Sequence, residues 1–127
     1  MGGETDGATG DVIFDRPEQL KRVQEMLLEG ETLYMVLDCK GFGTGFLGVT
    51  DKRVILRDDG FAKFKRSIVS IPYSRLHAVG VESGKGFFGG SSMLTLSAGD
   101  DDWQMTFRGS EKARAAYSVV MEHLLGT

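Results

Sequence analysis

Hydrophobic and polar residues alternate along much of this chain, in short segments separated by turn residues. The alternation is clearest over residues 32–40, where the two faces are Leu33, Met35, Leu37 and Cys39 on one side and Tyr34, Val36 and Asp38 on the other. A period of two predicts a β-strand, because successive side chains of a strand point to opposite faces. Six further strands are expected at about 45–50, 53–58, 65–71, 75–82, 91–98 and 102–108. Their spacing leaves no room for crossover helices, so the pairing should be largely antiparallel.

A helix is expected before the first of these strands. It should begin near Asp15, which can form a capping box with Glu18, and Pro17 suits its first turn. Gly30 should end it. Its apolar positions, which recur at helical spacing, are Leu20, Val23 and Leu27.

A second helix is expected at the C-terminal end, with Ser110 as its cap. Its apolar stripe is formed by Ala113, Ala116, Tyr117, Val120, Met121 and Leu124. Such a stripe has to be buried, and the open end of a bent β-sheet is the expected partner.

Length and composition indicate one domain without a membrane span. The chain has 127 residues and ordinary apolar and charged fractions, and no stretch approaches the roughly 18 apolar residues of a spanning helix. Residues 1–14 are acidic and rich in glycine, with no secretory signal pattern, and are expected to form a flexible tail before a single domain over residues 15–127. Cys39 is the only cysteine and lies in an apolar segment, so a buried thiol in the cytoplasm is expected.

Three short pieces of sequence carry a resemblance to a known family. They are Leu-Glu-Gly-Glu at 28–31, Val-Thr-Asp-Lys-Arg-Val-Ile at 49–55 and Ile-Pro-Tyr-Ser-Arg-Leu at 71–76. Together, and in this order, they resemble the bacterial pleckstrin-homology-like (PH-like) domain family over about residues 16–125. The resemblance implies a mainly β fold: a seven-stranded antiparallel bent sheet or partly open barrel, capped by the C-terminal helix, here with an additional N-terminal helix. It also implies ring-like homo-oligomers and no assigned activity.

Positive charge is concentrated in one part of an otherwise acidic chain. The net charge is −3, yet residues 52–66 hold six bases against two acids. A candidate site for anions or lipid therefore consists of Lys63, Lys65 and Arg66 with Phe61 and Phe64. The alternative, which we favour, is a solvated hairpin face. The loop over residues 39–45 has a single base, where phosphoinositide-binding relatives place several, and this argues against inositol-phosphate recognition there.

A second candidate is the glycine-rich loop over residues 84–90, where Phe87 and Phe88 are adjacent and Lys85 lies nearby. An apolar loop tip of this kind can enter a partner's pocket or a lipid interface. Alternatively, one of the two phenylalanines folds back over the core. A subunit or partner contact is the favoured functional role, ahead of membrane binding.

No pattern in the sequence indicates catalysis, a metal site or a cofactor. Gly43, Gly45 and Gly48 match a dinucleotide-binding spacing, but a strand follows them instead of a helix. The remaining candidates, which lack metal-ligand spacing or a nucleophile's setting, are His77, His123, the acidic run 100–102, Ser91 and Ser92. We therefore expect a non-catalytic interaction domain that self-associates or docks a protein partner. The alternative is peripheral binding to an anionic membrane, and no nucleic-acid partner is expected.

Overall fold

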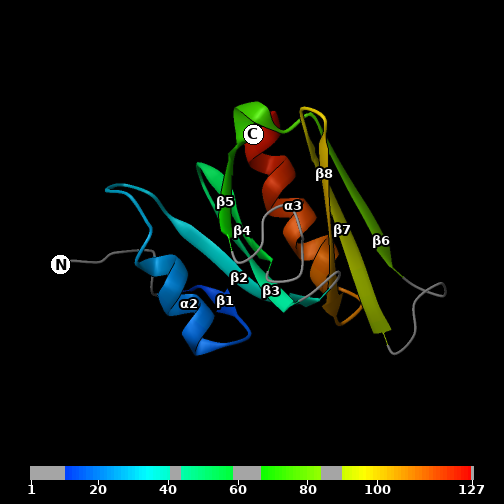
Figure 1. The fold of residues 1–127 in the computed structure, drawn as a ribbon, viewed down its shortest axis with the longest axis horizontal. Helices are drawn as coiled ribbons and strands as arrows, with labels where there is room; N and C mark the ends of the chain where they lie inside the picture. The colour runs from blue at the N-terminus through cyan, green and yellow to red at the C-terminus, as the bar shows by residue number, and fades with distance from the viewer. Residues whose placement is uncertain (1–10, 41–43, 59–66, 84–89, 127) are drawn as a thin grey trace.

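The computed structural model describes residues 11–40, 44–58, 67–83 and 90–126. The elements, in chain order, are β1 (Ile13–Phe14), α2 (Pro17–Gln24), β2 (Leu33–Lys40), β3 (Thr44–Thr50), β4 (Arg53–Asp58), β5 (Ser67–Pro72), a 3-10 turn (Tyr73–Arg75), β6 (Ala78–Ser83), β7 (Ser91–Ala98), β8 (Asp101–Arg108) and α3 (Lys112–Leu125). The expected mainly β fold with a C-terminal helix is confirmed (Figure 1).

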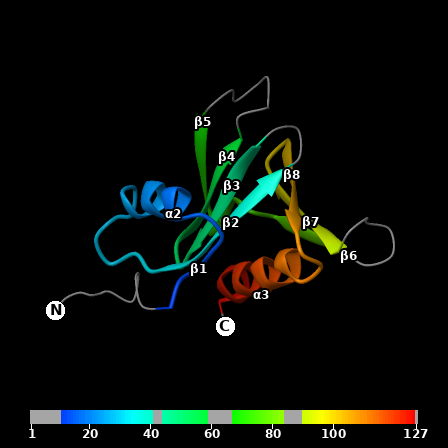
Figure 2. The same ribbon diagram turned by 90° about the horizontal axis from the view of Figure 1, so that it is seen from below.

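The strands form one bent, open sheet. Its order is β5-β4-β3-β2-β8-β7-β6, and β1 pairs with β2 beside this path. All neighbours along the path are antiparallel, but β2 and β8 meet only where Lys40 pairs with Thr106. The sheet therefore has two halves that separate from this point, and no closed barrel forms over the described strands. Helix α3 packs between the halves, while α2 covers the opposite side of β2 (Figure 2).

Two hydrophobic clusters hold these layers together, one on each face of β2. The larger lies under α3 and includes Met35, Leu37 and Cys39; the smaller lies under α2 and joins Val36 to Val23. Leu33 was expected to share a face with Met35, but it belongs to the smaller cluster. A shift in the pairing register between these two residues explains the difference, because one extra residue turns a side chain to the other face.

The first helix is shorter than expected and is capped differently. It ends at Gln24, and Gly30 instead takes a positive φ of 83° in the turn before β2. Its N-cap is Arg16, and no side chain caps it. The carboxylate of Asp15 accepts the Asp38 backbone N–H at 2.9 Å and forms an ion pair with Lys112 of α3. Asp15 thus connects β2 to the C-terminal helix, and the predicted capping box was wrong.

The C-terminal helix is capped by a residue from a distant strand. Its N-cap is Glu111, without a side-chain hydrogen bond, so the prediction of Ser110 was also wrong. The buried hydroxyl of Ser92 accepts the Ala113 backbone N–H at 3.0 Å and donates to the Gly109 carbonyl at 2.8 Å. Ser92 of β7 therefore satisfies the start of α3 from across the fold.

One strand was not expected at all. Ile13 and Phe14 form β1, which runs parallel to β2 opposite Met35 and Val36. It occupies the edge of β2 that β8 leaves, and it lies within the range expected to be tail. A further difference is that Tyr73–Arg75 form a 3-10 turn, so β6 begins at Ala78 rather than at residue 75.

Candidate functional site

The two sites that the sequence suggested cannot be placed. The glycine-rich candidate (Lys85, Phe87 and Phe88) and the basic candidate (Phe61, Lys63, Phe64, Lys65 and Arg66) both lie outside the described residues. The described part of the chain instead presents a groove and a buried polar network. Neither was identified as a site from the sequence.

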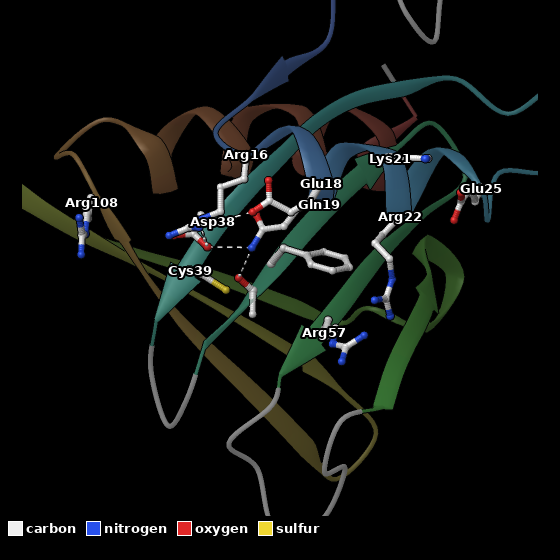
Figure 3. A pocket seen from close by; sticks show the side chains of 12 residues that line it. Arg16, Glu18, Gln19, Lys21, Arg22, Glu25, Asp38, Cys39, Arg57 and Arg108 are labelled. Atoms are coloured by element: carbon white, nitrogen blue, oxygen red, sulfur yellow. Dashed lines mark hydrogen bonds and ion pairs between the residues drawn. The ribbon is translucent and has the colours of Figure 1, made fainter.

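The groove lies between α2 and the outer face of the sheet, and its volume is about 680 Å³ (Figure 3). It is lined by Arg16, Glu18, Gln19, Lys21, Arg22, Glu25, Asp38, Cys39, Gly45, Phe46, Arg57 and Arg108. Its base follows the strand register, because Phe46 of β3 lies opposite both Asp38 of β2 and Arg57 of β4. Neighbouring strands are about 4.8 Å apart, so these three backbone positions span about 10 Å.

Gln19 fixes one part of the groove wall. Its side-chain amide nitrogen donates to Asp38 at 2.8 Å and faces the Gly45 carbonyl at 3.4 Å. Because both partners are acceptors, they determine which way the amide points. The Gln19 carbonyl oxygen is buried and has no hydrogen-bond partner among the described residues. The amide therefore holds the N-terminal half of α2 against the ends of β2 and β3.

The groove is richer in positive than in negative charge. Five basic and three acidic side chains line it. The charge of Arg16 is balanced by two carboxylates, because its guanidinium nitrogens lie 3.4 Å from an Asp38 oxygen and 3.5 Å from a Glu18 oxygen. Figure 3 shows Arg22 of α2 and Arg57 of β4 at the same end of the groove, with Arg108 at the other end. This arrangement favours an anionic ligand.

The buried network is centred on Glu31, which precedes β2. Arg53 donates to both carboxylate oxygens of Glu31, at 2.8 and 2.9 Å, and the Leu28 backbone N–H and the Thr50 hydroxyl donate at 3.0 and 2.7 Å. The remaining donors of Arg53 reach the Met26 carbonyl and the Ser70 hydroxyl. A bidentate arginine–carboxylate pair of this kind is among the stronger polar contacts in proteins.

This network shifts two pKa values. Burial acts to raise the pKa of Glu31, but the hydrogen bonds from Arg53, Leu28 and Thr50 and the charge of Arg53 together lower it from 4.5 to about 2. Tyr73 donates its hydroxyl to the Thr50 carbonyl at 2.6 Å. Burial, reinforced by the carboxylate of Asp51, raises the pKa of Tyr73. Both groups therefore keep their usual ionisation near neutral pH, Glu31 charged and Tyr73 neutral.

The network joins all three pieces of sequence that carried the family resemblance. Glu31 comes from residues 28–31, Thr50 and Arg53 from residues 49–55, and Tyr73 from residues 71–76. Asp51 adds a further link, because its carboxylate accepts the Thr32 N–H at 2.9 Å and its own N–H donates to the Thr32 carbonyl. These residues bond to one another, so their role is to join the hairpin of β3 and β4 to the start of β2.

Three further residues considered from the sequence make contacts within the fold. His77 precedes β6 with its ring 3.2 Å from the Gly99 carbonyl, and His123 of α3 stacks on Tyr73 at 5.6 Å between ring centres. Gly48 lies under α2, where an added Cβ would be 3.3 Å from Val23. Gly48 therefore permits a close contact between α2 and β3. Within the described ranges, no group of three metal-ligating side chains occurs, and no helix is long and apolar enough to cross a membrane.

Comparisons with known proteins find a family match and several similar structures. A family model described as "Bacterial PH domain" matches residues 28–122. A pleckstrin homology domain from Shewanella amazonensis SB2B is 23% identical with a TM-score of 0.56, and the match covers 87% of this chain and 99% of that one. A DUF1696-family protein with a pleckstrin-homology domain from Shewanella loihica PV-4 is 18% identical (TM-score 0.58; 87% and 93% covered). The C-terminal domain of an unknown protein from Leishmania infantum is also 18% identical (TM-score 0.59; 87% and 99% covered). No curated protein matches.

Proposed function

Because this chain belongs to the bacterial PH domain family, we propose that it is a non-catalytic interaction domain that self-associates or docks a protein partner. The observation that carries this proposal is the open edge of the sheet at β6. A strand at a sheet edge offers unpaired N–H and C=O groups to another chain, and many small β-domains bind partners by this kind of strand addition.

β6 is the last strand on its side of the described sheet. All six of its residues pair with β7, from Ala78 opposite Ser97 to Ser83 opposite Ser92, and no described strand lies on its other side. Val79 and Val81 pack toward the core, whereas Ala78, Gly80 and Glu82 are exposed. Gly80 in the middle leaves the edge without a side chain that would hinder an approaching strand.

A single substitution at this edge tests the proposal. Gly80→Lys places a charge on the edge, a device by which natural proteins prevent strand addition. The first Cβ has room, because its nearest neighbour would be the Thr95 Cβ at 3.7 Å. The solution mass of the wild-type chain, measured by light scattering at high micromolar concentration, should exceed the monomer mass, and Gly80→Lys should reduce it to the monomer.

Gln104→Lys is the matched control. Gln104 is exposed and lies in the same cross-strand row, two strands from Gly80 through Thr95, but in β8, away from the β6 edge. It adds the same charge to the same face without touching the edge, so the oligomer should persist. A wild-type chain that is only monomeric would refute self-association, and equal effects of the two lysines would refute the edge as its site.

The basic segment over residues 61–66 supports a second candidate function, peripheral binding to an anionic membrane. Its support is the sequence alone, with Lys63, Lys65 and Arg66 beside Phe61 and Phe64. Each base near an anionic surface would contribute about 1 kcal/mol. If this function is correct, liposome co-sedimentation should weaken with salt and disappear when the three bases become Ser. If self-association instead depends on the glycine-rich segment 84–90, changing Phe87 and Phe88 to Ser should disrupt the oligomer. The triple Ser change should then leave the oligomer intact.

The proposed location is the cytoplasm. Its support is the single cysteine, Cys39, which is buried in the larger hydrophobic cluster and has no partner cysteine in the sequence.

A further inference from the structure

The groove between α2 and the sheet has the size and chemistry of a ligand site. Its volume of about 680 Å³ lies within the range of about 300–1,000 Å³ in which pockets enclose small ligands. One wall is a helix, the base is formed by three strands, and Phe46 supplies a buried aromatic floor. The family match gives this groove no role, and the proposed self-association at the β6 edge does not use it.

Two arginines lie at one end of it. Arg22 is exposed on α2, and Arg57 is half-buried on β4, with its Cα opposite Phe46 (Figure 3). Each guanidinium has five N–H donors in a planar fork that matches a carboxylate or a phosphate. An anion placed between two such groups from separate elements can accept hydrogen bonds from both.

The acids of the groove narrow the choice of anion. Glu18 and Glu25 line its α2 side, and Asp38 lies at the end away from Arg57. Carboxylates on the rim disfavour a flat anionic membrane, as does the net charge of −3. The groove is also far larger than a single inorganic anion requires. An extended peptide fits better, because it can place acidic side chains at the arginines and leave neutral ones beside the acids.

We propose that this groove binds an acidic peptide segment of a partner protein, with Arg22 and Arg57 paired with its carboxylates. The inference rests on the proposed role as an interaction domain and specifies the partner's chemistry. It uses a face of the sheet separate from the β6 edge, so a self-associated chain could still receive the peptide.

The probe is a capped, fluorescent hexaglutamate peptide, titrated with the whole chain and followed by anisotropy. We expect binding at about 10 mM salt, where the Debye length is about 30 Å, and clearly weaker binding at about 150 mM, where it is about 8 Å. The double variant Arg22→Ser with Arg57→Ser should weaken binding by about tenfold or more. Amide shifts in the NMR spectrum should concentrate at residues 22, 46 and 57.

The matched control removes the same charge elsewhere. Arg75 lies in the 3-10 turn and Arg114 on α3, and both are exposed and outside the groove. Arg75→Ser with Arg114→Ser should leave hexaglutamate binding nearly unchanged. Thermal unfolding of both double variants verifies that they are folded, and a capped hexalysine peptide should not bind the wild-type chain.

Three results would overturn the inference. They are no hexaglutamate binding at low salt, equal losses in the two double variants, and groove-dependent binding of phosphatidylserine vesicles without binding of the peptide. Solution mass separates this inference from the proposed self-association. If the chain is oligomeric but does not bind the peptide, only the groove inference fails; if it binds the peptide as a monomer, only self-association fails.

Discussion

Replacing Glu31 by Gln tests how much the buried polar network contributes to stability. The Glu31 side chain is 2% exposed and that of Arg53 is 17% exposed, so their pairing is shielded from water. Gln preserves the shape but removes the negative charge opposite Arg53. Removing one partner of a buried ion pair costs about 3–5 kcal/mol, because the other charge remains uncompensated.

The pKa of Glu31 gives an independent magnitude. It is lowered from 4.5 to about 2, a difference that corresponds to about 3 kcal/mol of folding free energy. Because the pKa in the folded state lies below that of the unfolded chain, this contribution is complete above about pH 4.5. It disappears as the pH falls through about 2. Both arguments therefore predict that Glu31→Gln lowers the free energy of unfolding by about 3 kcal/mol at pH 7.

Urea unfolding at pH 7 and pH 3 measures this effect. The difference between wild type and Glu31→Gln should narrow by about 2 kcal/mol between the two pH values, because only the wild type loses the ionised carboxylate's contribution. Glu29→Gln is the control, since Glu29 is exposed and two residues away; it should change stability by less than about 0.5 kcal/mol. A Glu31→Gln variant as stable as wild type at pH 7, or a difference that stays constant with pH, would refute the reasoning.

Three further substitutions test the packing of the two helices by urea unfolding. Ser92→Ala should lower the free energy of unfolding by about 1–2 kcal/mol, because it leaves the Ala113 N–H without its acceptor. Ser110→Ala should lower it little, and the reverse order would restore Ser110 as the cap. Leu124→Ala should lower stability by about 1 kcal/mol or more, because Leu124 packs against the core, and Leu125→Ala, at a residue 65% exposed, should not; equal effects would show that this side of α3 faces solvent. Gly48→Ala should lower the free energy of unfolding by about 1 kcal/mol or more, because its Cβ would lie 3.3 Å from Val23 and push α2 away from β3. Gly80→Ala is the control, since its Cβ has room. A Gly48→Ala variant as stable as the wild type would show that α2 moves freely.

The strands were predictable because their information is local. The predicted ranges 53–58 and 91–98 agree with β4 (Arg53–Asp58) and β7 (Ser91–Ala98). Each combines alternating side chains with turn residues at its ends, and both signals can be read from consecutive residues. β1 was missed because its two residues are too few for a periodic pattern, and only the free edge of β2 explains it.

The helix caps were not predictable because their partners come from elsewhere in the fold. Asp15 is a good capping residue by type, yet its carboxylate bonds β2 and α3. Ser92 had no local reason to cap a helix, and its burial next to Ala113 arises from the packing of α3 on the sheet. In both cases a tertiary contact overrides a preference that is correct on average.

The groove was missed for a related reason. Gln19, Arg22, Asp38, Phe46 and Arg57 are scattered over 39 positions of the sequence, and only the strand register and the position of α2 bring them together. A signal for the buried network did exist. Glu31 and Arg53 both belong to the pieces that carried the family resemblance, and a charged residue next to a buried strand often has an opposite charge as its partner.

The network also changes how the family's sequence pieces relate to function. The run Thr50-Asp51-Lys52-Arg53 includes the first two bases of the basic stretch over residues 52–66. In the structure, however, Thr50 and Arg53 bind Glu31, and Asp51 binds the backbone of Thr32. These pieces therefore identify the fold, because they build the joint between the hairpin and β2, and they leave few donors for a ligand. If the chain binds a peptide as proposed, the residues that select the peptide lie outside these pieces, as Arg22 and Arg57 of the groove do. Replacing Arg22 and Arg57 should then change the peptide that is bound and leave this joint intact.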